Sequence, residues 1–256
     1  MGPAFTHPTD GCATLSPDGK KVAVGTSEGR VMHIDLKSGE ECELPGRHRE
    51  GVGSVMFSPT GENLVSRAGP ELKLWDLANI QLMANFEVYH AAAFSPDGTT
   101  LAVSCEETPG EVYALKLYDL TRKKLATLDL HNSSIDAVAF SPDGAMLASG
   151  VWYGIRILNV RTRTQLPFKI EGHTDPVSSL AFSPSGARLA SISRHAAVKL
   201  WDVKTGDQTI TLKVHRSRFP SVAFSPHGET LAATDGDDSV KLWRAATKDE
   251  ARNAGS

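Results

Sequence analysis

The sequence predicts an all-β fold in which one unit, a four-stranded antiparallel sheet, is repeated six times. The first observation is the tetrapeptide Ser-Pro-x-Gly, which recurs every 37 to 46 residues and so marks a repeat. The second is that short runs of apolar and β-branched residues flank each copy, while no stretch carries a sustained helical period. The six copies lie at Ser16–Gly19, Ser58–Gly61, Ser95–Gly98, Ser141–Gly144, Ser183–Gly186 and Ser225–Gly228.

Each repeat has the signals of four strands joined by turns. The proline of Ser-Pro-x-Gly fixes φ for the second position of a type I turn, and the glycine accepts the positive φ that follows, so the tetrapeptide predicts a hairpin turn. In the fifth repeat the expected strands are Val177–Phe182, Arg188–Ser193, Val198–Asp202 and Thr209–Val214. One such sheet cannot bury both of its faces, so the sequence predicts that the units stack around an axis.

The ends of the third strands carry the residues of a known family. They read Trp75-Asp76, Tyr118-Asp119, Trp201-Asp202 and Trp243-Arg244, with weaker forms at Ile34-Asp35 and Leu158-Asn159; the histidines ahead of first strands are His48, His131, His173 and His215. From about residue 7 to residue 244 the chain resembles the WD40 repeat family. The resemblance implies one β-propeller domain over residues 1–244, made of six four-stranded antiparallel blades. The polar tail 245–256 is expected to be disordered.

The resemblance also implies buried hydrogen-bonded sets, because in this family a His, a Ser or Thr, an Asp and the Trp of one repeat join together. The members expected here are His173, Ser193 and Trp201 in the fifth repeat, and His215, Asp237 and Trp243 in the sixth. Both sets are eroded: His195 occupies the Asp position of the fifth repeat, and Asp235 stands where the sixth would have Ser or Thr. The third repeat lacks the histidine and carries extra residues, Glu106 to Glu111, between its second and third strands.

Closure of the ring is an open question at the sequence level. The sixth repeat supplies three strands and ends at Trp243. Members of the family commonly complete the last blade with the N-terminal segment, and residues 3–7, with Phe5 and His7, are expected to do so here. This short segment contains a proline, so the pairing would be weak. A monomer is favoured, and the alternative is an open edge completed by a partner or by a second copy.

The motifs of the common enzyme classes are missing from the sequence. The serines of the turns and the histidines are expected on opposite faces of the propeller, so they cannot form a triad. There is no Gly-x-Ser-x-Gly, P-loop, dinucleotide or zinc pattern. Asp235-Gly-Asp237-Asp238 resembles part of a calcium loop but is interpreted as an acidic turn. The sequence predicts a non-enzyme without cofactor or metal, with an axial metal enzyme as the less favoured alternative.

The loops that enter first strands and join second to third strands are predicted to bind a peptide or protein segment. Aromatic and arginine residues are favoured at interfaces, and this face has Arg47, Arg49, Trp152, Tyr153, Arg194, His195, Arg216 and Arg218. The alternatives are that one ring of Trp152-Tyr153 caps a neighbouring blade and that the arginines are solvated turn charges. A second basic set on the opposite face, interpreted as solvated, comprises Arg122, Lys123, Lys124, Arg161 and Arg163.

Composition limits the partners and the compartment. The net charge is −3, so no basic field draws the protein to nucleic acid or anionic lipid. The N-terminus has no secretory pattern, and the apolar runs are too short to span a bilayer. Three widely separated cysteines favour a reducing compartment. The sequence thus predicts a soluble, cytoplasmic interaction scaffold, which can also be one part of a longer polypeptide.

Overall fold

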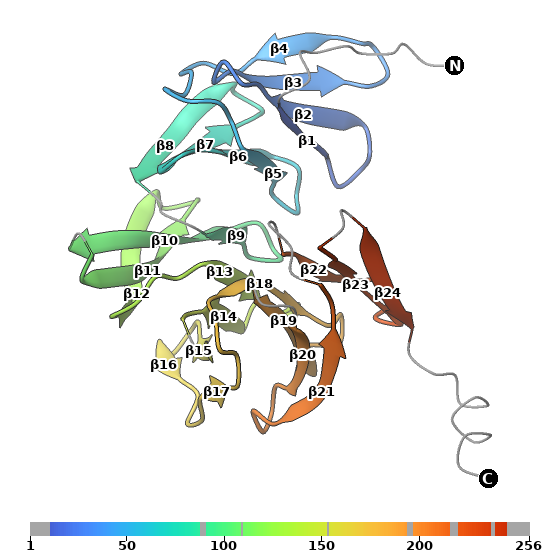
Figure 1. Cartoon of the computed structure of the whole chain (residues 1–256). Coiled ribbons are helices and arrows are strands. Elements are labelled where there is room, and N and C mark those ends of the chain that lie inside the picture. Colours follow the sequence, from blue (N-terminus) through green and yellow to red (C-terminus); the bar gives the residue numbers. More distant parts are fainter. Residues whose placement is uncertain are drawn as a thin grey trace. The chain divides into compact units, whose positions relative to one another are not determined.

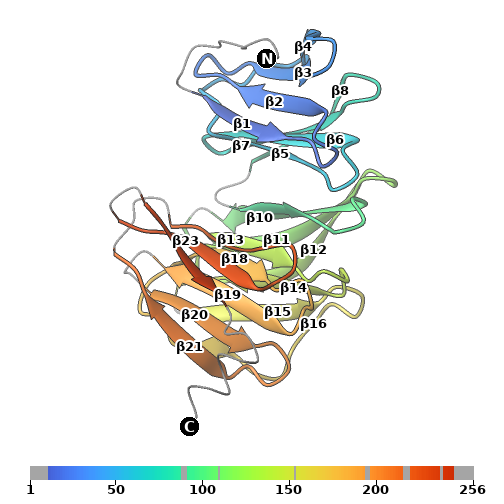
Figure 2. The same ribbon diagram turned by 90° about the vertical axis from the view of Figure 1, so that its right-hand side faces the viewer.

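The computed structural model describes residues 11–87, 91–108, 110–152, 154–193, 197–215, 220–236 and 239–244. These residues form strands and turns, arranged as six antiparallel sheets that follow one another along the chain. The chain divides into two compact units, Met1–Thr127 and Leu128–Ser256, with the boundary inside the last strand of the third sheet. Figures 1 and 2 show the sheets of each unit in two views.

The first three sheets follow the predicted pattern of four strands. The first comprises β1 (Cys12–Leu15), β2 (Lys21–Gly25), β3 (Val31–Asp35) and β4 (Glu41–Glu43). The second comprises β5 (Ser54–Phe57), β6 (Asn63–Ala68), β7 (Glu71–Asp76) and β8 (Gln81–Glu87). The third comprises β9 (Ala92–Phe94), β10 (Thr100–Thr108), β11 (Val112–Asp119) and β12 (Lys124–His131).

The last three sheets depart from the pattern at two places. The fourth comprises β13 (Ala137–Phe140), β14 (Met146–Gly150), β15 (Gly154–Asn159) and an outer strand split into β16 (Thr164–Gln165) and β17 (Ile170–Glu171). The fifth comprises β18 (Val177–Phe182), β19 (Arg188–Ser193), β20 (Ala197–Asp202) and β21 (Gln208–Lys213). The sixth has three strands within the described residues: β22 (Val222–Phe224), β23 (Thr230–Thr234) and β24 (Val240–Arg244).

The Ser-Pro-x-Gly turns join the first and second strands of each sheet, as predicted. All six glycines have a positive φ, between 68° at Gly19 and 75° at Gly228. Each serine hydroxyl accepts the backbone N–H five residues along, as Ser141 does from Met146 at 2.9 Å. Where the third residue is Asp, the serine also donates to that carboxylate, which closes the turn on itself.

The turns after the third strands depend on the Asp of the Trp-Asp motif. Asp76 accepts the backbone N–H groups of Ala78 and Asn79, and Asp202 accepts those of Lys204 and Thr205. The residue that completes such a turn has a positive φ, which suits glycine and strains other residues. It is glycine at positions 39 and 206, and the exceptions are Ile80, Lys123 and Arg163, with φ of 52°, 52° and 57°.

The core lies between successive sheets of each unit. In the second unit, Ile155, Val177, Leu189 and Trp201 belong to one buried cluster that joins the fourth and fifth sheets. Three more such clusters join the first to the second, the second to the third and the fifth to the sixth sheet. Burial of these apolar faces gives about 25 cal/mol for each Å² removed from water, so each sheet is stabilised by its neighbours.

The extra residues of the third repeat lengthen two strands. The interpretation of Glu106 to Glu111 as an insertion between strands is therefore wrong in part. Residues Glu106 and Thr108 continue β10 and pair with Tyr113 and Val112 of β11, across an irregularity in register. Lys116 binds Glu107 at 2.6 Å on this extension, and the hairpin becomes longer than that of any other described sheet.

Candidate functional site

The second sheet holds a complete hydrogen-bonded set that the sequence did not single out. Trp75 donates its indole N–H to the Ser66 hydroxyl at 2.9 Å, and Ser66 lies 2.7 Å from Nε2 of His48. Nδ1 of His48 lies 2.8 Å from Glu71, which takes the role expected of an Asp. Trp75, Ser66 and His48 are buried, so the chain of bonds fixes the loop before β5 against β6 and β7.

Glu71 is the charged end of this set. Burial raises its pKa, but hydrogen bonds from Lys73, His48 and Asn85 outweigh this and lower the pKa to about 2. Lys73 lies 2.7 Å from the carboxylate with its side chain only 7% exposed. The carboxylate thus stays ionised and neutralises a buried ammonium group, which is a structural task.

The fifth sheet has the second such set, and the structure changes the identity of its serine. The hydroxyl of Ser191 accepts the Trp201 indole N–H at 2.8 Å and lies 2.7 Å from Nε2 of His173. Ser193, the residue expected in this role, lies 3.1 Å from Nδ1 of the same ring. Burial lowers the pKa of His173 to about 4, so the ring is neutral at neutral pH. The signal for Ser191 was its spacing, because it follows its histidine by 18 residues, as Ser66 follows His48.

The fourth sheet has a histidine and a serine at the same positions, but the two side chains make no hydrogen bond among the described residues. Ser149 faces Arg156 across the ladder, as Ser191 faces Lys199 in the fifth sheet, and Leu158 occupies the position of Trp201. The Ser149 hydroxyl and both ring nitrogens of His131 are buried without a hydrogen bond to the described residues. Nε2 of His131 lies 3.3 Å from Asp129. Burial outweighs this carboxylate and lowers the pKa of His131 to about 4.

Within the described residues, the sixth sheet forms no buried set around its histidine. The side chain of His215 is 75% exposed, and its Nδ1 lies 3.2 Å from Asp235. The register shows that Ala233, which faces Lys241, corresponds to Ser191, so the placement of Asp235 at the Ser or Thr position is wrong. A hydrogen bond from Lys241 lowers the pKa of Asp235. Trp243 of β24 pairs with Leu231 of β23, and Asp237 lies outside the described residues.

The two arginines of the first unit lie on the loop-bearing face. Arg47 donates its Nε–H to the backbone carbonyl of Glu28 and lies 3.6 Å from the carboxylate of that residue. The guanidinium of Arg47 is thus bound to the turn between β2 and β3. Arg49 lines a pocket of about 190 Å³ together with Glu50, Pro70 and Glu71.

Trp152 is the exposed aromatic of the second unit's loop-bearing face. It lies in the turn between β14 and β15, where the N–H of Val151 bonds to the carbonyl of Gly154 at 3.0 Å. The exposed fraction of Trp152 is 49%, although most large side chains of these sheets are buried. The other candidates of this face lie outside the described residues, namely Tyr153, Arg194, His195, Arg216 and Arg218; so do Phe5 and His7 of the predicted closing strand.

The basic set of the opposite face contributes to turns. Arg122 donates from its backbone and from its guanidinium to Asp119, and Lys123 and Arg163 hold the positive-φ positions noted above. Among the described residues, no group of three or more His, Cys, Asp or Glu side chains is placed to hold a metal ion. The described part of the chain also has no helix long and apolar enough to cross a membrane.

Comparison with known proteins agrees with the Trp-Asp motifs, the turns and the hydrogen-bonded sets. The family model for the WD domain, G-beta repeat, matches residues 122–155, 164–202 and 206–244. The chain contains WD40 repeats. The antiparallel sheets, four of them four-stranded, are consistent with an all-β propeller, and WD40 repeats support a general role as a protein-interaction scaffold.

Three relatives are WD-repeat proteins or larger proteins with a similar region. The chain is 31% identical over 144 residues to "Telomerase protein component 1" of Mus musculus, which covers 55% of this chain and 5% of that protein. It is 28% identical over 135 residues to "WD repeat-containing protein 90" of Mus musculus, with 50% and 7% covered. It is 31% identical over 81 residues to "WD repeat-containing protein 1" of Gallus gallus, with 30% and 13% covered. The chain therefore spans a small part of each relative.

Proposed function

We propose that the chain is a non-catalytic scaffold whose loop-bearing face binds a peptide or protein segment. The observation that carries this proposal is the exposure of Trp152, 49%, in a turn whose ends are fixed in β14 and β15. An indole buries a large area at low cost in conformational entropy, which makes Trp a frequent anchor of interfaces. The proposal includes a cytoplasmic location without nucleic acid or a cofactor, and the free Cys12, Cys42 and Cys105 agree with a reducing compartment.

The hydrogen-bonded sets support this use of the face. The side chains of these sets are buried below the loops and are hydrogen-bonded to one another. His48 and His173 are therefore not exposed to a ligand. A rigid scaffold below exposed turns is the usual arrangement of a binding surface. In the first unit, Arg49 and the small pocket beside Glu71 and Pro70 offer a separate contact point.

The test is a peptide selection followed by matched variants. Peptides selected from a random library on the immobilised chain are measured for affinity to the wild type, to Trp152→Ala and to Ile210→Ala. Ile210, 46% exposed on β21, is the control for loss of an equally exposed apolar side chain. Loss of about tenfold or more in Trp152→Ala alone supports the proposal. Selected peptides that bind all three proteins equally would refute it.

A second candidate function is assembly, and the edge of β24 favours it. Its side chains Val240 and Leu242 are 60% and 67% exposed, and no described strand pairs with its outer edge. In the five other sheets, a further strand covers the corresponding edge. An uncovered apolar edge accepts a strand readily, so a strand from a partner or a second copy would complete this sheet.

Light scattering separates the two candidates. The solution mass is measured for the whole chain and for a variant without residues 1 to 8. A monomer that loses cooperative unfolding on deletion supports the prediction that the N-terminal segment supplies the strand. A dimer or larger species that is indifferent to the deletion supports completion by another chain. A charged substitution, Leu242→Lys, should then dissociate the assembly.

A further inference from the structure

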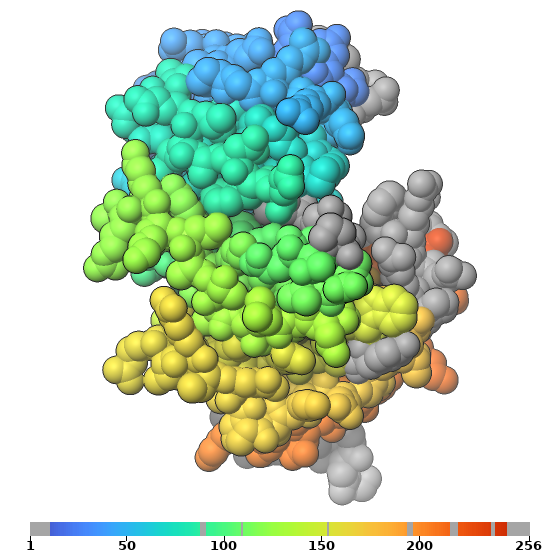
Figure 3. Space-filling view, turned by 90° about the vertical axis from the view of Figure 1, so that its left-hand side faces the viewer, coloured from blue at the N-terminus to red at the C-terminus, as the bar shows by residue number. Residues whose placement is uncertain are grey.

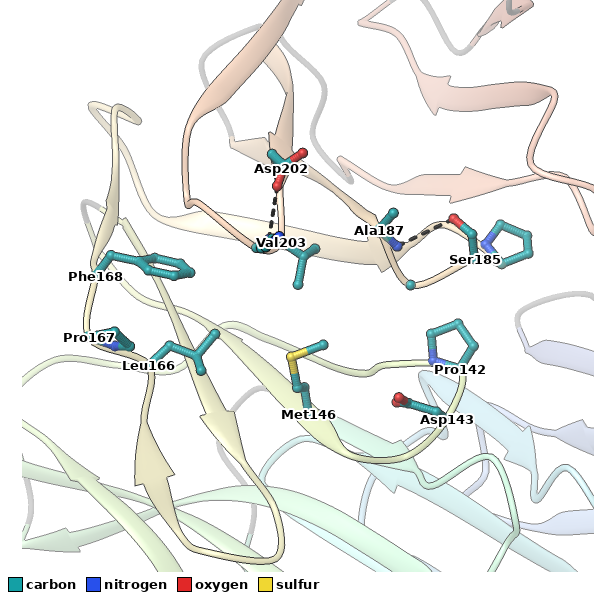
Figure 4. A pocket seen from close by; sticks show the side chains of 13 residues that line it. Pro142, Asp143, Met146, Leu166, Pro167, Phe168, Ser185, Ala187, Asp202 and Val203 are labelled. Carbon is teal, nitrogen blue, oxygen red and sulfur yellow. Dashed lines mark hydrogen bonds between the residues drawn. The ribbon is translucent and has the colours of Figure 1, made fainter.

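A groove lies in the second unit on the side away from Trp152, where the Ser-Pro-x-Gly turns of the fourth and fifth sheets meet the turn after β20. Its volume is about 880 Å³, within the range of sites that hold small ligands or several side chains. Figure 4 shows Phe168 and Leu166 at one end, Pro142 and Asp143 at the other, and Met146 and Val203 between them. The groove is therefore largely apolar, with a carboxylate at one end.

The wall with Phe168 is built by an interruption of the outer strand. Leu158 pairs with Gln165 and Ile155 pairs with Ile170. Between these two pairs the outer strand advances by five residues, whereas β15 advances by three. The two extra residues fall around Pro167, which cannot donate to the ladder. In the space-filling view, the yellow segment around β16 and β17 lies at the surface (Figure 3).

The bulge is held in place by its neighbour. An added Cβ at Gly206, where φ is 81°, would come within 2.4 Å of the Phe168 ring, so the ring packs directly on this glycine. The fold does not require this interruption, because the outer strands β8 and β12 are continuous over seven and eight residues, although β8 has a register shift against β7 between Leu74 and Trp75. The interruption removes ladder bonds from the sheet and adds an aromatic wall to the groove.

The charged residues that line the groove are Asp143, Asp202 and Lys204, so carboxylates outnumber the one ammonium group. Asp143 uses Oδ1 for the Ser141 hydroxyl and the backbone N–H of Ala145, and Asp202 uses Oδ1 for its own turn. No hydrogen bond or ion pair of the described residues involves the second oxygen of either carboxylate. The second oxygens of Asp143 and Asp202 can therefore accept hydrogen bonds from a cationic side chain that lies beside the apolar residues of the groove.

We propose that this groove binds a short extended peptide that carries a bulky apolar residue beside an arginine or lysine. The apolar side chain packs on Met146, Phe168 and Val203, and the cation binds Asp143. Aromatic-lined grooves recognise extended segments that contain proline, since the preformed conformation of such segments loses little entropy on binding. The site is separate from the loop-bearing face, so it does not depend on the function proposed for that face.

Three synthetic peptides test the proposal. The first combines leucine, proline and arginine, the second replaces arginine by glutamate, and the third replaces leucine by serine. Binding is followed by the methyl resonance of Met146, assigned with the Met146→Leu variant. We expect the first peptide to shift this resonance, the second to bind at least three- to fivefold more weakly, and the third to give no shift. No shift with the first peptide at about millimolar concentration, or equal binding of all three, would overturn the proposal.

A matched pair of variants tests the carboxylate. Asp143→Asn keeps the acceptor that closes its Ser-Pro-Asp-Gly turn, and Asp97→Asn makes the same change in the equivalent turn of the third sheet. We expect affinity for the first peptide to fall about three- to fivefold in Asp143→Asn and to stay unchanged in Asp97→Asn. Equal weakening by Asp143→Asn and Asp97→Asn would mean that the peptide does not contact Asp143.

Discussion

The same substitution at equivalent serines of neighbouring sheets should change stability in opposite directions. Ser191 in the fifth sheet accepts from Trp201 at 2.8 Å and lies 2.7 Å from His173. Ser149 in the fourth sheet is equally buried, but its hydroxyl has no hydrogen bond within the described residues. The number of hydrogen bonds, rather than burial, therefore separates the two positions.

The magnitudes follow from what each alanine leaves behind. Ser191→Ala leaves the buried indole N–H and a ring nitrogen without partners, and each such group costs about 1–3 kcal/mol, so we expect a loss of about 2–6 kcal/mol. Ser149→Ala removes a hydroxyl that has already lost its solvation, so we expect a gain of about 1 kcal/mol. Ser66→Ala in the second sheet should behave like Ser191→Ala, because Ser66 has the same two partners.

Urea denaturation followed by far-UV circular dichroism measures these differences. The midpoints can be compared directly if the slope of the transition is unchanged. The reasoning would be refuted if Ser149→Ala lowered the free energy of unfolding by 2 kcal/mol or more, since that value requires a hydrogen-bonded hydroxyl. It would also be refuted if Ser191→Ala were neutral.

Three further predictions concern a turn, an ion pair and pH. Ile80→Gly should raise the free energy of unfolding by about 0.5–1 kcal/mol, because it relieves a β-branched residue at φ 52° at some cost in chain entropy; a loss of stability in urea denaturation would contradict this. Glu71→Gln should lower it by about 2–3 kcal/mol, because Lys73 keeps a buried charge without a counterion; the outcome that contradicts this is an unchanged midpoint. The pKa values of His131 and His173 are lowered to about 4, so both rings bind a proton more readily in the unfolded chain. Stability should therefore fall as the pH drops from about 6.5 to 4, by roughly 1.4 kcal/mol per pH unit for each histidine, and a flat profile in thermal melts over this range would show that the rings are not buried.

The repeated turns made the sheets predictable, because local chemistry determines them. Ser-Pro-x-Gly requires the same φ values at every copy, and all six glycines adopt them. The outer strand of the fourth sheet was less predictable. Residues 166–169 interrupt the pairing with β15, and Phe168 packs in the space that Gly206 leaves. This contact is with the neighbouring sheet, so it cannot be predicted from the local sequence.

The hydrogen-bonded sets were predicted in kind but not in membership. The sequence identified the histidines and tryptophans, since these residue types are rare and recur with the repeat. It did not identify Ser191, because Ser191 and Ser193 lie two residues apart on β19 and therefore point to the same face of the sheet. Ser66 was missed as well. Glu71 was also missed. It reaches His48 because it lies at the end of β7, where it pairs with Glu87 of β8, and this strand register is known only from the structure.

The distribution of these sets bears on the proposed binding face. The second and fifth sheets, where Trp, Ser and His are joined, have loops fixed by buried bonds. The turn with Trp152 belongs to the fourth sheet, where Leu158 replaces the tryptophan and Ser149 and His131 are left without hydrogen bonds among the described residues. Unsatisfied buried groups are costly, and proteins retain such costs most often near functional sites. Of these three sheets, the one that presents the exposed Trp152 is therefore also the one whose histidine and serine lack hydrogen bonds among the described residues.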